Sequence, residues 1–184
     1  STHPGEERIL LNIYRKLLGA FPYLRLLLAP RHPDRADKIA ALVRHFGFKP
    51  SRISLFQPKE ALKDTVFILD TVGELISFYA AADIVFVGGS LVRKGGQNIL
   101  EPASLGKPVI FGPHMFNFRD IAAEFLRSNA ALQALTPKDL LSIIKELLEN
   151  KGRTIELARN SKEVILRNQG ATEKSLDLIR KLIV

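Results

Sequence analysis

The chain has 184 residues, enough for one compact domain with a buried core and too few for two ordinary ones. It contains no cysteine, its four histidines are too far apart to predict a zinc site, and no apolar run approaches the roughly 20 residues of a membrane-spanning helix. The net charge of +8 indicates an anionic partner, and the scattered basic residues favour a phosphorylated ligand or an anionic membrane surface and argue against nucleic acid.

Helices and strands are expected to alternate along the chain. Apolar residues at helical spacing predict a helix over residues 6–20, which ends at Pro22, and residues 24–29 predict a buried parallel strand. Further helices are expected at residues 33–46, 73–82, 99–105, 117–127, 138–150, 153–167 and 171–183, and further strands at 53–56, 66–69, 84–87, 107–111 and 131–135. The alternation predicts the α/β class: one domain over residues 1–184, with a Rossmann-like parallel sheet and helices on both faces.

Ligands of such sheets bind beyond the carboxyl ends of the strands. Directly after the predicted strand at 84–87, four glycines fall within the nine residues 88–96. Backbone N–H groups of a glycine-rich turn suit a phosphate, and Ser90 and Asn98 could add hydrogen bonds. The alternative is a pair of tight turns without a ligand, since the spacing matches neither a dinucleotide-binding fingerprint nor a P-loop.

Glu101 follows Asn98 by three residues, at the start of a predicted short helix. Its carboxylate could accept hydrogen bonds from the two hydroxyl groups of a ribose. The alternative is a capping box, with Asn98 as the N-cap.

Other strand-to-helix junctions carry polar residues that would face the same crevice. They include Thr2 and His3 before the first helix, Arg31 after the strand at 24–29, and the segment 70–74 after the strand at 66–69. Each has an ordinary explanation, such as helix initiation or a solvated charge. Together they predict a ligand crevice along one edge of the sheet.

Several of these segments combine into a pattern that spans the chain. The pieces are Ser1-Thr-His-x-Gly-Glu-Glu7, Pro30-Arg31-His32, Asp70-Thr-x-Gly-Glu-Leu75, Phe86-Val-Gly-Gly-Ser90, Gly95-Gly-x-Asn98, Leu100-Glu-Pro102 and Gly112-Pro-His-x-x-Asn-Phe118. In this order they resemble the C-terminal domain of the 3-deoxy-D-manno-octulosonic acid (Kdo) transferases. The resemblance implies one half of a GT-B glycosyltransferase, whose N-terminal acceptor domain is absent from this chain.

The resemblance also implies a function and a set of site residues. The implied donor is CMP-Kdo, the acceptor is a lipid A precursor at the cytoplasmic face of the bacterial inner membrane, and transfer inverts the anomeric centre. No cofactor or metal is expected, and the general base would belong to the missing domain, so the isolated chain is expected to be soluble and inactive. The implied donor-binding residues are Thr2, His3, Arg31, Thr71, Gly73, Glu74, Gly89, Ser90, Gly95, Gly96, Gln97, Asn98 and Glu101.

One position departs from the family pattern. Gln97 stands where the family usually has histidine, and an amide cannot carry a positive charge.

Two alternatives to a Kdo transferase remain open: a UDP-sugar-dependent transferase or epimerase half of the same architecture, and a non-enzymatic nucleotide-binding module.

Overall fold

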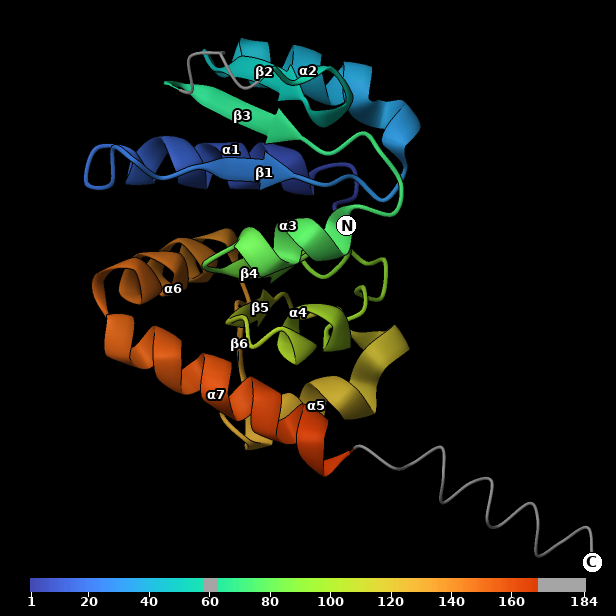
Figure 1. Cartoon of the computed structure of the whole chain (residues 1–184), viewed down its shortest axis with the longest axis vertical. Helices are drawn as coiled ribbons and strands as arrows, with labels where there is room; N and C mark the ends of the chain where they lie inside the picture. The colour runs from blue at the N-terminus through green and yellow to red at the C-terminus, as the bar shows by residue number, and fades with distance from the viewer. Residues whose placement is uncertain (58–62, 169–184) are drawn as a thin grey trace, which may run out of the picture.

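Two three-stranded parallel sheets form the middle of the molecule, which we describe from a computed structural model over residues 1–57 and 63–168 (Figure 1). The first sheet has the order β1–β3–β2 and the second the order β4–β5–β6, and all neighbouring strands are parallel. The strands are β1 (Leu26–Leu28), β2 (Lys49–Arg52), β3 (Thr65–Ile68), β4 (Val85–Val87), β5 (Val109–Phe111) and β6 (Ala131–Gln133).

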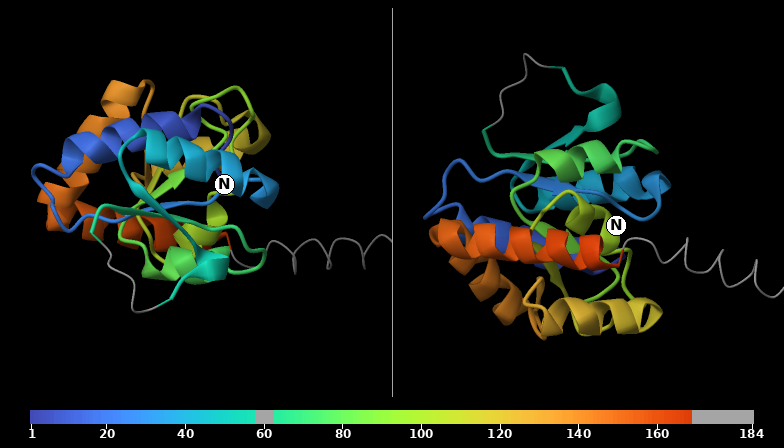
Figure 2. Two further views of the ribbon diagram at one scale, coloured as in Figure 1. Left: turned by 90° about the horizontal axis from the view of Figure 1, so that it is seen from above. Right: turned by 60° about the horizontal axis from the view of Figure 1, so that its bottom comes forward.

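Helices cover both faces of these sheets, which confirms the predicted α/β class (Figure 2). On one face lie α1 (Glu6–Leu17), α2 (Ala36–His45) and α6 (Pro137–Glu149), and on the other lie α3 (Leu75–Ala81), α4 (Leu100–Ser104) and α7 (Lys151–Arg167). Helix α5 (Arg119–Arg127) contacts β6 and α7. The short 3₁₀ helices are η1 (Pro33–Arg35), η2 (Ile53–Leu55) and η3 (Phe116–Phe118).

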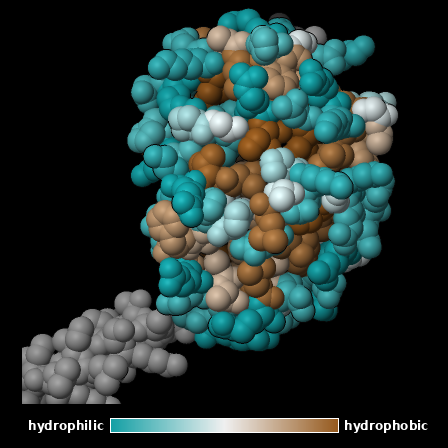
Figure 3. Space-filling view, turned by 180° about the vertical axis from the view of Figure 1, so that it is seen from behind, coloured by the Kyte–Doolittle hydropathy of each residue, from teal (hydrophilic) through white to brown (hydrophobic). Residues whose placement is uncertain are grey.

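The apolar core connects the two sheets through the helices. Leu11 of α1, Leu28 of β1, Ile110 of β5 and Leu140 of α6 are fully buried and belong to one cluster. Helix α1 therefore packs against elements of both sheets. Partly buried apolar side chains border this cluster, and Figure 3 shows apolar side chains gathered across the middle of the rear face, with polar side chains around them. In the part of the chain that the structure describes, no helix is long and apolar enough to cross a membrane.

Most predicted elements are present, with shifted ends. The predicted strand at 53–56 is wrong: the strand is Lys49–Arg52, and the apolar residues after it form η2. Proline interrupts the strand pattern at Pro50, but β2 is an edge strand, where a missing N–H group is tolerated. Thr136 caps α6 in a capping box, with Pro137 in the first turn, as expected. The predicted helix at 171–183 lies outside the described residues.

The sequence predicts one sheet, whereas the structure has two. Strands β1 and β4 each pair on one side, and the segment 1–3 passes between their carboxyl ends. Thr2 forms a parallel bridge with Pro30. On the other side, Gly88 has no room for a side chain, because a Cβ atom there would lie 2.1 Å from the Ser1 carbonyl oxygen.

Candidate functional site

The carboxyl ends of the strands bring the predicted site residues to one edge of the molecule. Residues 1–3 lie in its middle, Arg31 follows β1, the segment 71–74 follows β3, and the glycine-rich segment follows β4. The two sheets contribute opposite sides of this edge. In the structure these residues lie along one edge, and their side chains fall into buried and partly exposed groups.

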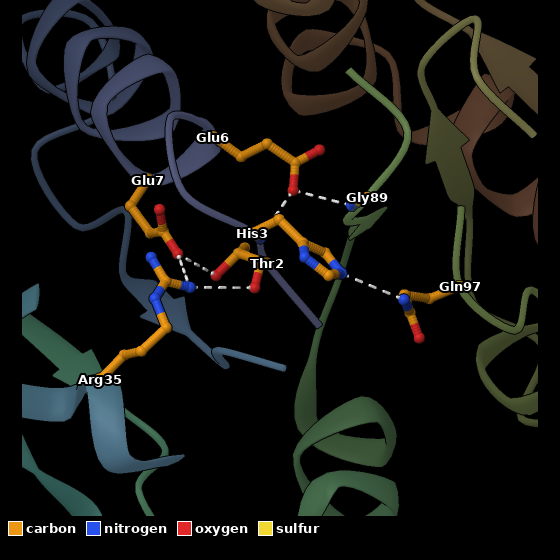
Figure 4. A network of polar contacts seen from close by, with 7 residues as sticks. All are labelled: Thr2, His3, Glu6, Glu7, Arg35, Gly89 and Gln97. Atoms are coloured by element: carbon orange, nitrogen blue, oxygen red, sulfur yellow. Dashed lines mark hydrogen bonds and ion pairs between the residues drawn. The ribbon is translucent and has the colours of Figure 1, made fainter. Parts of the chain in front are cut away.

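The first group consists of buried residues whose hydrogen bonds hold the polypeptide backbone along this edge. Its central residue is Glu6. Its side chain is fully buried, and its carboxylate accepts hydrogen bonds from the amides of Gly89 at 2.7 Å, Ser90 at 3.1 Å and Leu91 at 3.1 Å. The amide of His3 also donates to it, at 2.9 Å. Successive N–H groups in a turn form an anion-binding concavity, and here the protein's own carboxylate occupies it (Figure 4).

The structure shows Gly89 and Ser90 in internal hydrogen bonds, and their predicted contact with the donor stays a prediction. Their amides point at Glu6, and the Ser90 hydroxyl is fully buried. That hydroxyl donates to the Val87 carbonyl oxygen and accepts from the Gly112 amide, at 2.8 Å in the second case. Ser90 therefore joins the turns after β4 and β5 and has no group directed at a ligand.

Glu7 plays a corresponding part on the other sheet. Only 2% of its side chain is exposed, and its carboxylate lies 2.9 Å from the Arg35 guanidinium. It also accepts a hydrogen bond from the Thr2 hydroxyl at 2.9 Å (Figure 4). Thr2 is buried and its hydroxyl is engaged in this internal contact, so its predicted contact with the donor stays a prediction.

Gly95 and Gly96 are also buried and belong to the same scaffold. The Gly96 amide donates to the Gly89 carbonyl oxygen at 2.9 Å, and the Gly95 carbonyl oxygen accepts from the Asn117 amide at 3.1 Å. Gly96 has a φ of +76°, and a Cβ atom there would lie 2.2 Å from the Met115 sulfur. Glycine at this position is explained by packing and backbone conformation.

The second group is exposed in part and contains His3 and Gln97. The Gln97 Nε2 atom lies 3.3 Å from the His3 Nε2 atom, so the amide donates when the imidazole is neutral with its proton on Nδ1 (Figure 4). Burial lowers the pKa of the His3 imidazole, against the opposing effect of Glu6, and Lys94 and Arg35 lower that pKa further. Neutral His3 is therefore the favoured form.

Asn98 and Glu101 form a second half-exposed pair. The Asn98 side-chain amide donates to the Glu101 carboxylate at 3.0 Å, and the Asn98 side-chain oxygen accepts from the Leu100 amide at 3.0 Å. The capping box, which was the alternative explanation for Glu101, is not formed, because Ile99 is the N-cap residue of α4 and the Asn98–Glu101 contact joins two side chains. Burial, together with the charge of Glu101, raises the pKa of Tyr79 to about 12, which places Glu101 near α3.

The remaining predicted residues lie on the side of the edge that belongs to the first sheet. Arg31 is exposed after β1. The Thr71 hydroxyl donates to the Glu74 carboxylate, and Gly73 between them has a φ of +92°. This turn is exposed and is linked to its own neighbours. Groups of three or more potential metal ligands do not occur within the described ranges 1–57 and 63–168.

Sequence patterns indicate the roles of Glu6, Glu7 and Arg35 only weakly. Acidic residues in a first helical turn have an ordinary explanation in the helix dipole, and nothing local distinguishes a solvated glutamate from one that enters a turn 83 positions away. For Glu6 and Glu7, their position in the Gly-Glu-Glu part of the resemblance was the one available indication.

Several known proteins are similar to this chain over most of its length. No family model matches the chain. It is 40% identical over 182 residues to the Kdo transferase of Haemophilus influenzae, across 98% of this chain and 42% of that protein. For the Kdo transferases of Bordetella pertussis and Aquifex aeolicus the identities are 36% and 32%, across 97% and 89% of this chain and 42% and 44% of theirs. The chain thus spans less than half the length of these curated relatives.

Two solved structures are also similar. The C-terminal CMP-Kdo binding domain of WaaA from Acinetobacter baumannii matches with a TM-score of 0.84 and 33% identity, across 91% of this chain and 86% of that one. The C-terminal domain of the glycosyl transferase group 1 family protein LpcC from Francisella tularensis matches with a TM-score of 0.59 and 14% identity, across 88% and 77%. The second likeness concerns the fold alone.

Proposed function

This chain belongs to the Kdo transferase family, and from that premise we propose that it is the donor-binding domain of a glycosyltransferase that uses CMP-Kdo. The observation that carries the proposal is the match to the WaaA domain, which extends over 91% of this chain. The row of polar residues at the carboxyl ends of the strands supports it, because ligands of such sheets bind there.

The half-exposed side chains supply the groups that such a donor needs. We assign the ribose hydroxyls to the Glu101 carboxylate, which Asn98 orients through its 3.0 Å hydrogen bond. Because Glu6 already accepts hydrogen bonds from the turn amides, we assign the contacts to the donor phosphate to side chains. These are Gln97, neutral His3 and the cations Arg31 and Lys94. Cations beside a departing phosphate stabilise the negative charge that develops on it.

The proposed reaction is a direct displacement at the anomeric carbon of Kdo. An acceptor hydroxyl of a lipid A precursor forms the new bond to that carbon as the bond to the CMP phosphate breaks, so the configuration inverts. The acceptor proton passes to a general base of the N-terminal domain, which we place outside this chain. Because this acceptor is embedded in a membrane, we place the full-length protein at the cytoplasmic face of the inner membrane. The net charge of +8 on this chain would favour contact with anionic lipids there.

Transfer assays with two forms of the protein test this proposal. The full-length protein should move Kdo from CMP-Kdo to the lipid A precursor, and a mixture with UDP-sugars in place of CMP-Kdo should give no product. The chain 1–184 alone should form no product with either donor. Transfer by the isolated chain would contradict the assignment of the general base to the N-terminal domain. Product from a UDP-sugar would support the alternative, a UDP-sugar-dependent transferase.

A further inference from the structure

We propose that the exposed face of α1 and α2 is a docking surface for an anionic lipid bilayer, whose phosphate groups bind the arginine and lysine side chains of these helices. The inference rests on the membrane location in the proposed function and gives that contact a surface on this chain. Because its test needs no nucleotide, its failure would leave the assignment of the donor standing.

The positive charge of the chain is concentrated in one stretch. Residues 8–52 contain ten arginines and lysines and two aspartates. The whole chain has 27 basic and 19 acidic residues, so the residues outside this stretch carry 17 of each sign and no net charge. The stretch contains nearly all of α1 and the whole of α2. The net charge of +8 therefore comes from the part of the chain that forms these two helices.

Helix α1 presents positive charge to solvent without negative charge beside it. Its two acidic residues, Glu6 and Glu7, are buried and hold the backbone contacts described above. Its most exposed side chains are Arg8, Arg15 and Lys16. Within residues 1–57 and 63–168, none of these three cations has a carboxylate at ion-pair distance.

The half-buried ring of Phe46, directly after α2, holds two of these cations. The guanidinium carbon of Arg8 lies 5.8 Å from the ring centroid, and that of Arg15 lies 5.3 Å from it. A guanidinium group over an aromatic ring keeps N–H groups in its own plane, where they can donate to phosphate oxygens. Two phosphate-binding groups are thus held at one ring between the helices.

Helix α2 extends the cationic surface. It lies next to α1 on the same face of the molecule, and it exposes Lys38 and Arg44 (Figure 2). Its acidic residue Asp37 is paired with Arg52. Since no carboxylate in the described part of the chain lies at ion-pair distance from Lys38 or Arg44, both are available to an anionic partner.

Helix α7, on the opposite face, has a different charge pattern. Arg153 pairs with Glu156 at 2.8 Å, and Arg159 and Arg167 pair with Glu163 at 3.9 Å and 3.2 Å. Such pairs within a helix stabilise it and leave little charge for a partner. The cations of α1 and α2 are not used in this way, so the two faces of the molecule differ in what they offer to an anionic surface.

A bilayer fits the cationic face better than a nucleic acid does. Proteins that bind single-stranded nucleic acid stack bases on exposed aromatic rings, whereas the Phe46 ring is half-buried and covered by guanidinium groups. Tyr23, in the loop that follows α1, is 86% exposed, and Arg25 lies two positions further on. Exposed tyrosine near basic residues is typical of a membrane–water interface.

The place of this face in the fold suits an acceptor that is embedded in a membrane. Helix α1 begins directly after the segment 1–3, and Arg8 follows Glu6 by two positions. The cationic face therefore starts at the edge where we place the donor. A bilayer that lies along α1 and α2 would lie beside that edge.

Sedimentation of the chain 1–184, which forms its own apolar core, with phospholipid vesicles tests the proposal. The chain should bind vesicles of equal parts phosphatidylglycerol and phosphatidylcholine, and it should not bind vesicles of phosphatidylcholine alone. Arg8→Gln combined with Arg15→Gln should weaken binding to the mixed vesicles by about tenfold or more, because each basic side chain near an anionic surface contributes to binding. Arg159→Gln combined with Arg167→Gln makes the same change of charge on α7, and as the matched control it should alter binding by less than about twofold.

A second double variant keeps the test independent of the Phe46 contacts. Lys38→Gln combined with Arg44→Gln removes two charges from α2 and should also weaken binding to the mixed vesicles by about tenfold or more. Equal binding by the α1, α2 and α7 variants would overturn the proposal, as would equal binding of the unsubstituted chain to both kinds of vesicle. If the chain ignores the mixed vesicles but binds a single-stranded RNA through Arg8 and Arg15, the surface is one for nucleic acid and the proposal is wrong.

Discussion

The carboxylate of Glu6 lies 2.7 Å from the amide nitrogen of Gly89, although 83 positions separate the two residues. Through this contact the first turn of α1 holds the glycine-rich turn that follows β4. The neighbouring Glu7 holds Arg35 and Thr2 beside the other sheet. Two consecutive glutamates thus fix both sides of the edge at which we place the donor.

We expect substitution of Glu6 by glutamine to destabilise the domain by about 2–4 kcal/mol, because the neutral side chain loses charge-assisted hydrogen bonds and turns a donor group toward backbone N–H groups. Urea unfolding followed by circular dichroism would measure the change. The matched control is Glu146→Gln on the exposed side of α6, which should stay within about 0.5 kcal/mol of the unsubstituted protein. Equal midpoints for Glu6→Gln and the unsubstituted protein would contradict the structural role of Glu6.

Gly88→Ala should destabilise the domain by more than about 2 kcal/mol, since the new methyl group would lie 2.1 Å from the Ser1 carbonyl oxygen and backbone would have to move. Gly19→Ala offers a control with no atom within 4 Å of the added methyl group. Thermal unfolding of the two variants measures the difference. If both melt at the same temperature, the segment 1–3 does not lie against Gly88.

Stability should depend on pH through His3. Burial lowers the pKa of His3 in the folded state below the value of 6.5 that applies to an unfolded chain. The unfolded state therefore binds the proton more tightly, and the stabilisation from neutral His3 is present above pH 6.5 and is lost as the pH falls through the lower folded pKa.

Unfolding free energies measured across this range check the effect, with His3→Asn as the test variant and the exposed His45→Asn as its control. The first substitution should flatten the pH dependence and the second should leave it unchanged. A folded-state pKa of His3 at or above 6.5, measured by NMR titration, would show that the sign is wrong.

The sequence predicted the architecture well, because alternating apolar helices and short apolar runs between turn residues leave few alternatives to a parallel α/β fold. It failed at β2, whose residues Lys49–Arg52 are polar and include a proline. The periodicity of apolar residues cannot identify such an edge strand, since its pairing with β3 comes from the backbone.

The sequence predicted that polar residues gather beyond the carboxyl ends of the strands, and the structure has them there; that they bind a donor stays a prediction. Strand-to-helix junctions determine where polar residues gather, and they predicted His3, Gln97 and Glu101 on the edge where the structure has them. The sequence could not show that Glu6 occupies the anion-binding turn, because local pattern does not indicate which of several carboxylates is buried there. For the same reason Ser90 was predicted to be a ligand contact, although its hydroxyl joins two turns.

Titration of the full-length protein with CMP, UMP and UDP by calorimetry, with Glu101→Ala beside the control Glu146→Ala, tests the central claim most directly. We predict that CMP binds in preference to the two uridine nucleotides, that Glu101→Ala weakens CMP binding by at least about tenfold through loss of the contacts to the ribose, and that Glu146→Ala leaves it unchanged. A preference for UDP, or equal CMP affinity in the Glu101→Ala variant, would contradict the assignment of this domain and of its donor site.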